Sequence, residues 1–285
     1  MTILDETYTL SNSVEIPKLG LGTWFIDDAQ AAEAVRAAVE IGYRNIDTAQ
    51  AYGNERGVGE GVRTAGVPRD KLFVSTKLAA EIKDHDQAVD AIDGSLEKLG
   101  IEYIDLMLIH SPQPWNDFRG GDYAEGNREA WRALEEAHQA GKIRSIGVSN
   151  FQQQDLENVL QGATVVPHVN QLLVHAGNTP WELLDYCEGK QILVEAYSPI
   201  AHGAILQNAE VQAMAVKYGV SVPQLCIRYT LQLGTVSLPK TANPEHMRSN
   251  AEVDFKISGD DMDAMRSLRN VDYGEHSMFP VYSGK

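Results

Sequence analysis

The feature that most constrains the fold is a repeated alternation of short apolar runs with longer amphipathic segments. In the first cycle, "KLGLGTW" (18–24) has the character of a short buried strand. Residues 28–42 follow, with apolar side chains at helical spacing and a terminal glycine that predicts the end of a helix. The apolar runs lack strict inside–outside alternation. That is typical of parallel strands that are covered on both faces.

Eight strand candidates of this kind occur in the 285 residues, and each is followed by a predicted helix. The candidates cover residues 18–24, 44–49, 72–78, 103–110, 143–151, 168–174, 191–199 and 235–240. Eight such units predict an α/β fold, a (β/α)8 TIM barrel, with a doubly wound open sheet as the competing architecture. An N-terminal β-hairpin around Asn12-Ser13 precedes them, and a final helix (258–270) leads into a short C-terminal tail. No break suggests a second domain, so 1–285 is expected to be a single barrel domain.

Composition and charge exclude several classes of function. The net charge of −16 argues against nucleic-acid binding, which needs clustered Lys and Arg. No apolar run approaches the roughly 20 residues of a membrane span, and no signal peptide is predicted at the start. Cys187 and Cys226 form no pattern typical of a metal site. The sequence therefore predicts a cytoplasmic monomer without metal, membrane or nucleic-acid partners, which acts on a small molecule.

Polar residues gather where the predicted strands end. In a (β/α)8 barrel, the carboxyl ends of the strands form the mouth that carries the active site. Tyr52 lies five residues beyond Asp47, close enough for its ring to fold back over that mouth. The other residues at these ends are Trp24, Asp47, Lys77, His110, Ser149, Asn150, Gln171, Tyr197, Ser198, Lys240 and Thr241.

Each ionisable candidate also has a purely structural interpretation. Asp47 has the side chain of a helix N-cap, and Tyr52 that of a half-buried aromatic residue. His110 is compatible with a hydrogen-bonded core histidine. Lys77 is harder to explain structurally, because a lysine within a buried strand needs a partner. Four such groups near strand ends favour a common function.

Together these groups suit proton transfer to a carbonyl oxygen. A tyrosine phenol has a reference pKa near 10, and a neighbouring ammonium is expected to lower it. Asp47 can pair with Lys77 and keep it charged, while His110 can bond a substrate oxygen or relay a proton to Tyr52. The set therefore predicts a general acid, with Tyr52 as the donor. No HExxH, GxSxG or P-loop pattern points to other chemistry.

Reduction of a carbonyl also needs a hydride, and hence a cofactor. The chain lacks GxGxxG, and "GVGEGV" (57–62) has neither its spacing nor a preceding strand, so a Rossmann site is not predicted. The barrel mouth offers another place. Tyr197 can stack on a nicotinamide, and Lys240 and Thr241 precede a helix N-terminus suited to phosphate. The carboxamide of the nicotinamide can be held by Ser149, Asn150 and Gln171.

Several motifs, in the same order, resemble the aldo-keto reductase family over nearly the whole chain. They are "GLGTW", "GYRNIDTAQAYGNE", "STKL", "YIDLMLIH", "GKIRSIGVSNF", "NQLLVH", "VEAYSPIAHG" and "LPKTANPEHMRSN". Shorter bacterial members, including diketogluconate reductases, look most similar. The resemblance implies NAD(P)H-dependent reduction of aldehydes or ketones to alcohols on a (β/α)8 barrel.

The resemblance also implies roles for individual residues. The catalytic set would be Asp47, Tyr52, Lys77 and His110. The cofactor set would be Gly22, Thr23, Ser149, Asn150, Gln171, Tyr197, Ser198, Ile200, Lys240, Thr241, His246 and Asn250. The substrate set would be Trp24, Ser111 and Trp115.

Three departures from the family pattern affect the expected cofactor and substrate. His246 stands where an arginine usually grips the 2′-phosphate of NADP, and Ser249 replaces a glutamate that contacts the adenine. Ser111 replaces a tryptophan, and Trp115 follows four residues later. Neutral histidine cannot match a guanidinium on phosphate. We therefore expect NADPH as cofactor with a weakened preference, which makes use of NADH plausible, and an altered substrate pocket.

The tail after Val271 is short, which suggests an open pocket. Met278, Phe279 and Tyr282 either line this pocket or fasten the tail to the barrel. Two other functions compete with reduction. One is a Schiff-base aldolase that uses Lys77, and the other is a non-catalytic protein that senses nicotinamide nucleotides. The sequence does not indicate the physiological substrate or the favoured direction of the reaction.

Overall fold

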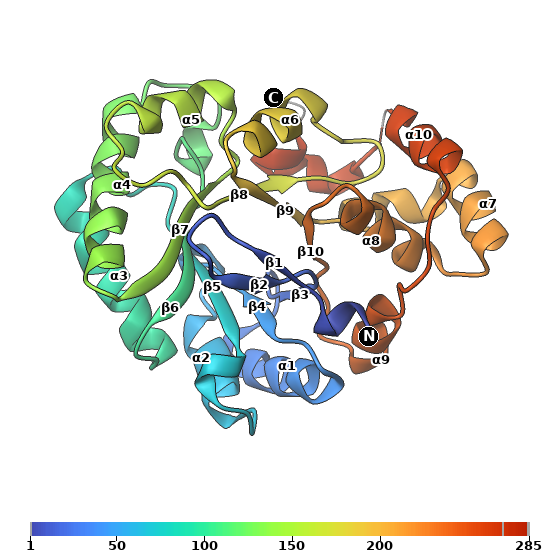
Figure 1. Ribbon diagram of the computed structural model, residues 1–285, viewed down its shortest axis with the longest axis horizontal. Helices are drawn as coiled ribbons and strands as arrows, with labels where there is room; N and C mark the ends of the chain where they lie inside the picture. Colours follow the sequence, from blue (N-terminus) through green and yellow to red (C-terminus); the bar gives the residue numbers. More distant parts are fainter. Residues whose placement is uncertain (1, 270, 284–285) are drawn as a thin grey trace.

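Eight parallel strands form the centre of the computed structural model, which describes residues 2–269 and 271–283 (Figure 1). They lie side by side in the order of the sequence, from β3 to β10. Bridges between Leu19 and Ser237 and between Gly22 and Lys240 join the two outer strands and close the barrel. The strands are β3 (Gly20–Gly22), β4 (Asn45–Asp47), β5 (Phe73–Leu78), β6 (Ile104–Ile109), β7 (Ile143–Ser149), β8 (Val169–Leu173), β9 (Leu193–Tyr197) and β10 (Val236–Leu238).

Helices surround the strands and confirm the predicted (β/α)8 barrel (Figure 1). They are α1 (Asp28–Ile41), α2 (Glu55–Thr64), α3 (His85–Leu99), α4 (Ala124–Gln139), α5 (Gln153–Leu160), α6 (Trp181–Gly189), α7 (Ala209–Tyr218), α8 (Val222–Gln232), α9 (Pro244–Ala251) and α10 (Gly259–Ser267). Both α7 and α8 lie between β9 and β10. The helix predicted over 258–270 ends at Ser267, and position 270 lies outside the described residues.

The predicted N-terminal hairpin is present and covers one end of the barrel. Strands β1 (Thr7–Thr9) and β2 (Glu15–Pro17) pair antiparallel. Ile16 is fully buried in an apolar cluster with side chains from the barrel strands, among them Leu106 and Val236. Because the hairpin covers the amino ends of the strands, ligands must enter at the opposite end, where the strands terminate.

The three glycines of α2 allow unusually close helix packing. A Cβ at Gly59 would lie 2.0 Å from the carbonyl oxygen of Leu99 in α3, and one at Gly57 would lie 2.1 Å from that of Asp28 in α1. The glycines in "GVGEGV" therefore serve packing, since they let α2 lie between its two neighbours. This matters for the mouth of the barrel because α2 begins three residues after Tyr52.

Replacing Gly59 by alanine is expected to lower the free energy of unfolding by about 2 kcal/mol, because the backbone of α3 must move aside. Gly94 is the matched control. It also lies within a helix, but a Cβ there meets nothing within 4 Å. Gly94→Ala is therefore expected to be neutral or to stabilise the protein by up to about 1 kcal/mol. Denaturant unfolding of both variants measures the difference, and equal effects would contradict the packing argument.

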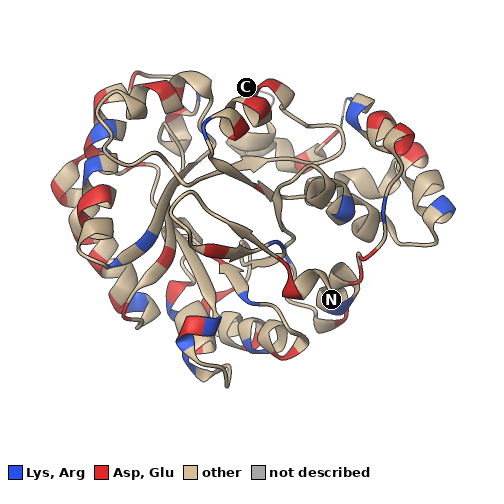
Figure 2. Cartoon of the chain, in the orientation of Figure 1, with Lys and Arg blue, Asp and Glu red and all other residues tan. Residues whose placement is uncertain are grey.

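Charged residues of both signs are spread over the surrounding helices (Figure 2). No helix within residues 2–269 and 271–283 is both long and apolar enough to cross a membrane. In the same part of the chain, no three His, Cys, Asp or Glu side chains are grouped so that they could hold a metal ion.

Candidate active site

Asp47 is the last residue of β4 and is 4% exposed. It is not a helix N-cap, because α2 begins eight residues later, with Asn54 at the N-cap position. The Asn54 side chain instead accepts a hydrogen bond from Thr48 Oγ1 at 2.6 Å and donates to the carbonyl oxygens of Thr23 and Ile26, each at 2.9 Å. These bonds fix the segment that carries Tyr52 against the loop after β3.

Lys77 is fully buried on β5 and has the partner that its burial requires. Its Nζ donates to Asp47 Oδ1 at 2.7 Å, to Asp47 Oδ2 at 2.8 Å and to the Thr48 carbonyl at 2.8 Å. Three bonds donated by one nitrogen require all three hydrogens of an ammonium, so the lysine is held in its charged form. A Schiff-base lysine must be neutral to attack a carbonyl. This geometry therefore argues against the aldolase alternative.

Tyr52 closes a 3₁₀ turn after β4, and Gly53 follows it in the left-handed conformation with φ of 70°. Lys77 Nζ lies 3.4 Å from the phenol oxygen. Burial, and then the negative charge of Asp47, raise the pKa of Tyr52 well above 10. The expectation that Lys77 would lower this pKa is therefore wrong for the cofactor-free cavity. Burial of the ring is the largest cause of the raised pKa, and the carboxylate of Asp47 adds to it.

His110 follows β6, and its ring centroid lies 5.6 Å from that of Tyr52. Burial, and then the charge of Lys77, lower the pKa of His110 well below 6.5, so the imidazole is neutral. A neutral imidazole has one N–H. Its Nδ1 is buried and has no partner among the described residues. Because an unpaired buried acceptor costs less than an unpaired donor, the proton belongs on Nε2, where it is available to a ligand oxygen.

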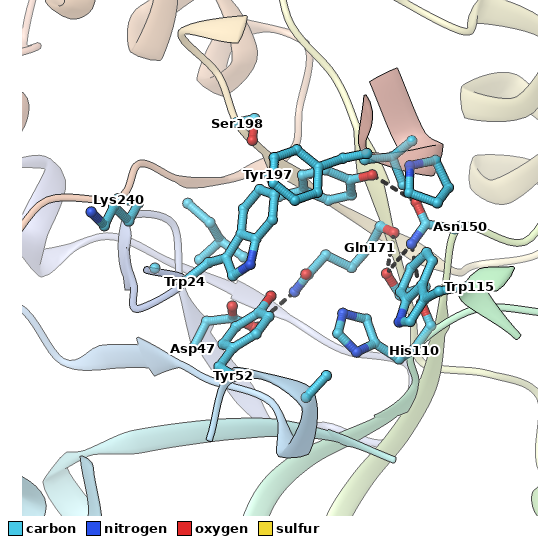
Figure 3. A pocket seen from close by; sticks show the side chains of 17 residues that line it. Trp24, Asp47, Tyr52, His110, Trp115, Asn150, Gln171, Tyr197, Ser198 and Lys240 are labelled. Atoms are coloured by element: carbon cyan, nitrogen blue, oxygen red, sulfur yellow. Dashed lines mark hydrogen bonds between the residues drawn. The ribbon is translucent and has the colours of Figure 1, made fainter. Parts of the chain in front are cut away.

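These side chains meet at a cavity of about 360 Å³ (Figure 3). Lys77 lies beneath it and does not line it. Its walls are formed by Gly22, Trp24, Asp47, Ala51, Tyr52, His110, Trp115, Ser149, Asn150, Gln171, Tyr197, Ser198, Leu238, Lys240, Phe279, Pro280 and Val281. The structure therefore brings together predicted residues from seven different strand ends.

A second cavity of about 450 Å³ contains most of the remaining residues predicted for the cofactor. Ile200, Thr241, His246 and Asn250 line it, as does Ser249. The two cavities share Trp24, Ser198 and Lys240, so they form one extended groove. The second cavity ends beside α9, whose first turn includes His246.

Besides Lys77, two predicted site residues line neither cavity. Thr23 is fully buried, and its Oγ1 donates to the Asp47 carbonyl at 2.9 Å, so it supports the strand end. Ser111 is also fully buried, and its carbonyl accepts from Lys83 at 2.8 Å. The wall expected at Ser111 is supplied by Trp115, whose ring stands edge-on to His110 with centroids 5.0 Å apart. A tryptophan four residues further along thus reaches the same part of the cavity.

Comparison with known proteins decides the family. The aldo/keto reductase family model matches residues 18–270. The chain belongs to the aldo-keto reductase family. It is therefore an oxidoreductase of a family that uses nicotinamide cofactors.

Relatives and solved structures agree with this assignment. The chain is 42% identical to glyoxal reductase from Bacillus subtilis over 94% of each chain. It superposes on an aldo/keto reductase from Brucella melitensis with a TM-score of 0.86, at 36% identity, covering 92% of this chain and 97% of that one. It also superposes on a Bombyx mori aldo-keto reductase in complex with NADP, with a TM-score of 0.85, at 33% identity over 97% and 98% of the two chains.

The C-terminal tail of this aldo-keto reductase both lines the cavity and is fastened to the barrel. Phe279, Pro280 and Val281 form one wall. Tyr282 is buried, and its hydroxyl lies 2.6 Å from Ser198 Oγ. Met278 is 79% exposed, so it neither lines the cavity nor fastens the tail to the barrel. The tail is short, but it narrows the mouth instead of leaving it fully open; positions 284–285 lie outside the described residues.

A nicotinamide dinucleotide fits the groove of this aldo-keto reductase. Tyr197 presents its ring to the first cavity, and its hydroxyl is fixed by a 2.7 Å bond to Asn150 Oδ1. Amide and hydroxyl groups lie beside that ring. Lys240 lies where the two cavities meet, and partial desolvation by its surroundings lowers the pKa of its ammonium. The groove thus offers an aromatic surface at Tyr197, a cation at Lys240 and a second cavity beyond it. This order matches a nicotinamide ring, a pyrophosphate and a second base.

One buried carboxyl in this aldo-keto reductase was not foreseen from the sequence. Gln171 Nε2 donates to Asp47 Oδ1 at 2.9 Å and also to Glu195 Oε2 at 2.9 Å. Glu195 is fully buried in β9. The signal that identified Lys77, a charged residue inside an apolar strand, also applies to the glutamate in "ILVEAY".

Proposed function

We propose that this aldo-keto reductase reduces an aldehyde or ketone to an alcohol, taking hydride from NAD(P)H and a proton from Tyr52. The observation that carries the proposal is a phenol that shares one cavity with a neutral histidine and whose oxygen lies 3.4 Å from the ammonium of a buried ion pair. A tyrosine phenol, with a reference pKa near 10, is protonated at neutral pH. It is therefore an available acid for a carbonyl oxygen that becomes negative.

Each of the four catalytic side chains has a separate role in the proposed reaction. Tyr52 gives its proton to the carbonyl oxygen, and His110 orients that oxygen through Nε2–H. Lys77 holds a positive charge 3.4 Å from the phenol oxygen, where the charge stabilises the phenolate left after proton transfer. Asp47 keeps this lysine charged and in place.

The proposed cofactor is NADPH, which supplies the hydride when bound. Tyr197 would stack against the nicotinamide, and Ser149, Asn150 and Gln171 would hold its carboxamide. Lys240 would bind the pyrophosphate, with the 2′-phosphate toward His246. Arg248, next to these residues in sequence, is exposed and does not line the cavity. With histidine in place of a guanidinium at this end, we propose that NADH is also used.

Replacing His246 by arginine is expected to tighten NADPH binding about tenfold, because a guanidinium bonds phosphate in two places. NADH has no 2′-phosphate, so its dissociation constant should change less than about twofold. Arg248→Ala serves as the control, since it removes a nearby cation from outside the cavity. Fluorescence titration with both cofactors measures the effect. Equal tightening of NADPH and NADH would contradict the placement of the phosphate.

A substrate panel with both cofactors tests the proposed function. Small aldehydes, keto acids and keto sugars are suitable, and glyoxal should be included because a relative is named glyoxal reductase. Turnover with NADPH and measurable turnover with NADH are expected. A preference for NADPH above about a thousandfold, roughly 4 kcal/mol, would refute the cofactor part. Binding of NADPH without turnover of any carbonyl would favour the nucleotide-sensing alternative.

We further propose that residues 1–285 act as one domain, as a monomer in the cytoplasm. The groove is built within one chain from the ends of its barrel strands, with the tail of the same chain as a wall. Sedimentation of the purified protein tests the monomer.

A further inference from the structure

Glu195 lies inside the barrel, directly below the proposed nicotinamide site. Residues two apart on a strand point to the same side. Tyr197 lines the cavity above Glu195, while Leu193 packs on the apolar cluster under the hairpin. Glu195 therefore occupies the layer between the cavity and the closed end of the barrel. It is fully buried, and the proposed proton transfer does not use it.

The Gln171 amide is fixed by two carboxyl groups. Gln171 pairs with Glu195 across β8 and β9, and its Nε2 has two hydrogens. One is donated to Asp47 and the other to Glu195, each at 2.9 Å. Both amide hydrogens are thus directed at carboxyl oxygens. The Oε1 of Gln171 remains as the acceptor on a side chain that lines the cavity, where a carboxamide N–H can be bound.

The charges around Gln171 balance only if Glu195 is neutral. Lys77 is the one cation that acts on this carboxyl within the described part of the chain, and its three hydrogens are used by Asp47 and Thr48. A second carboxylate would leave one uncompensated negative charge in the barrel interior, which is costly.

Two buried oxygens lack partners in the described part of the chain and can share a proton carried by Glu195. Glu195 Oε1 and Asn45 Oδ1 both lack partners among the described residues, and the Asn45 side chain lies against the Glu195 carboxyl. A proton on Glu195 makes it a donor to such an acceptor. Burial, and then the charge of Asp47, raise the pKa of Glu195 to about 7, against the lowering effect of the Gln171 and Asn45 hydrogen bonds and of the Lys77 charge. The adjacent strand β10, with the sequence Val-Ser-Leu, contributes no titratable side chain.

We propose that Glu195 is a positioning residue that orients the Gln171 amide while protonated, and that its ionised form favours the oxidised nicotinamide over the reduced one. The second part rests on the proposed function, because it requires the nicotinamide to lie above Gln171. The oxidised ring carries a positive charge and the reduced ring does not. A negative charge on Glu195 attracts only the oxidised form. Binding of the oxidised cofactor then releases a proton from Glu195 to solvent.

Infrared spectroscopy of the cofactor-free protein tests the charge state alone. At about pH 6, exposed carboxyls are ionised, so a buried protonated acid gives a separate C=O band. This band is expected in the wild type, and it should be lost at about pH 9. It should be absent from Glu195→Gln at both pH values and retained in Glu55→Gln, which alters another buried glutamate, outside the cavity. No difference between the wild type and Glu195→Gln would overturn the proposal.

Cofactor affinities test the second part. The ratio of the dissociation constants of NADP⁺ and NADPH is expected to fall at least about fivefold between about pH 6 and pH 9 in the wild type. Changes of charge elsewhere in the groove and on the 2′-phosphate affect both cofactors, so the ratio largely cancels them. The ratio should be independent of pH in Glu195→Gln, whose amide can accept from Gln171 and donate to Asn45. Glu55→Gln should behave like the wild type.

Calorimetry of the wild type gives a result that does not depend on any variant folding. In two buffers of different ionisation enthalpy near pH 7, NADP⁺ binding should release more protons than NADPH binding. Equal proton release, or a ratio of affinities that stays flat in the wild type, would overturn the role of Glu195 toward the cofactor. If neither cofactor binds, the proposed function fails together with this part, whereas the infrared band reports on the proton of Glu195 independently.

Discussion

Tyr52→Phe is expected to lower kcat for carbonyl reduction by at least about a thousandfold while changing the dissociation constant of NADPH less than about twofold. The substitution removes the only proton that the phenol can give and leaves the aromatic ring in place. Its position in the cavity, with its oxygen 3.4 Å from the Lys77 ammonium, makes Tyr52 the available acid. Steady-state kinetics and cofactor titration separate the two effects, because proton transfer contributes to turnover and not to cofactor binding.

A tyrosine outside the groove is the control for this substitution. Tyr186 lies in α6 and lines neither cavity, so Tyr186→Phe should keep turnover within about twofold of the wild type. Near-normal turnover in Tyr52→Phe would remove the phenol from the mechanism. Loss of NADPH binding in the same variant would mean that the ring positions the cofactor, and the kinetic effect could not then be assigned to proton transfer.

Lys77→Met is expected to lower the free energy of unfolding by about 3–5 kcal/mol and to abolish reduction. The ammonium is fully buried and bonds both oxygens of Asp47. Removing it leaves a carboxylate in the barrel interior without a counter-charge, which costs more than the ion pair itself contributes. Denaturant unfolding measures the loss of stability, and kinetics on the folded fraction measures activity.

The double variant Asp47→Asn with Lys77→Met tests the cause of that loss. Neutralising the isolated carboxylate should restore at least about half of the lost stability without restoring activity. Lys142→Met is the matched surface control, because Lys142 and its partner Asp93, 2.5 Å away, are both exposed. It should change stability by less than about 1 kcal/mol. If the two single lysine variants lose the same stability, burial of the Asp47–Lys77 pair is not the cause.

The barrel was predictable because its signal is local and repeated. Each short apolar run before an amphipathic segment became a strand before a helix, as β5 and α3 illustrate. The mouth was predictable for the same reason. Once the strands are placed, their last residues must converge, and Asp47, His110 and Gln171 all line one cavity.

Features that depend on packing in three dimensions were not predictable in the same way. The direction of the Tyr52 pKa shift depends on how deeply the ring is buried and on the nearby charge of Asp47, which the spacing of residues does not reveal. Thr23 lies near the end of one predicted strand and Ser111 directly follows another, yet both side chains are buried in the protein and do not face the groove. The Tyr282–Ser198 bond joins residues 84 positions apart. Glu195 could have been predicted, because it is a charged residue within an apolar strand, the same signal that identified Lys77.

Transfer of deuterium from the cofactor tests the central claim most directly. NADPH labelled at C4 of the nicotinamide should be incubated with the wild type and a small aldehyde that it reduces. For the wild type, the account predicts one deuterium on the carbinol carbon of the alcohol, transferred from one face of the labelled ring. For Tyr52→Phe, it predicts no alcohol above background and therefore no labelled product. An alcohol formed without cofactor-derived deuterium, or labelled alcohol formed equally fast by Tyr52→Phe, would contradict it.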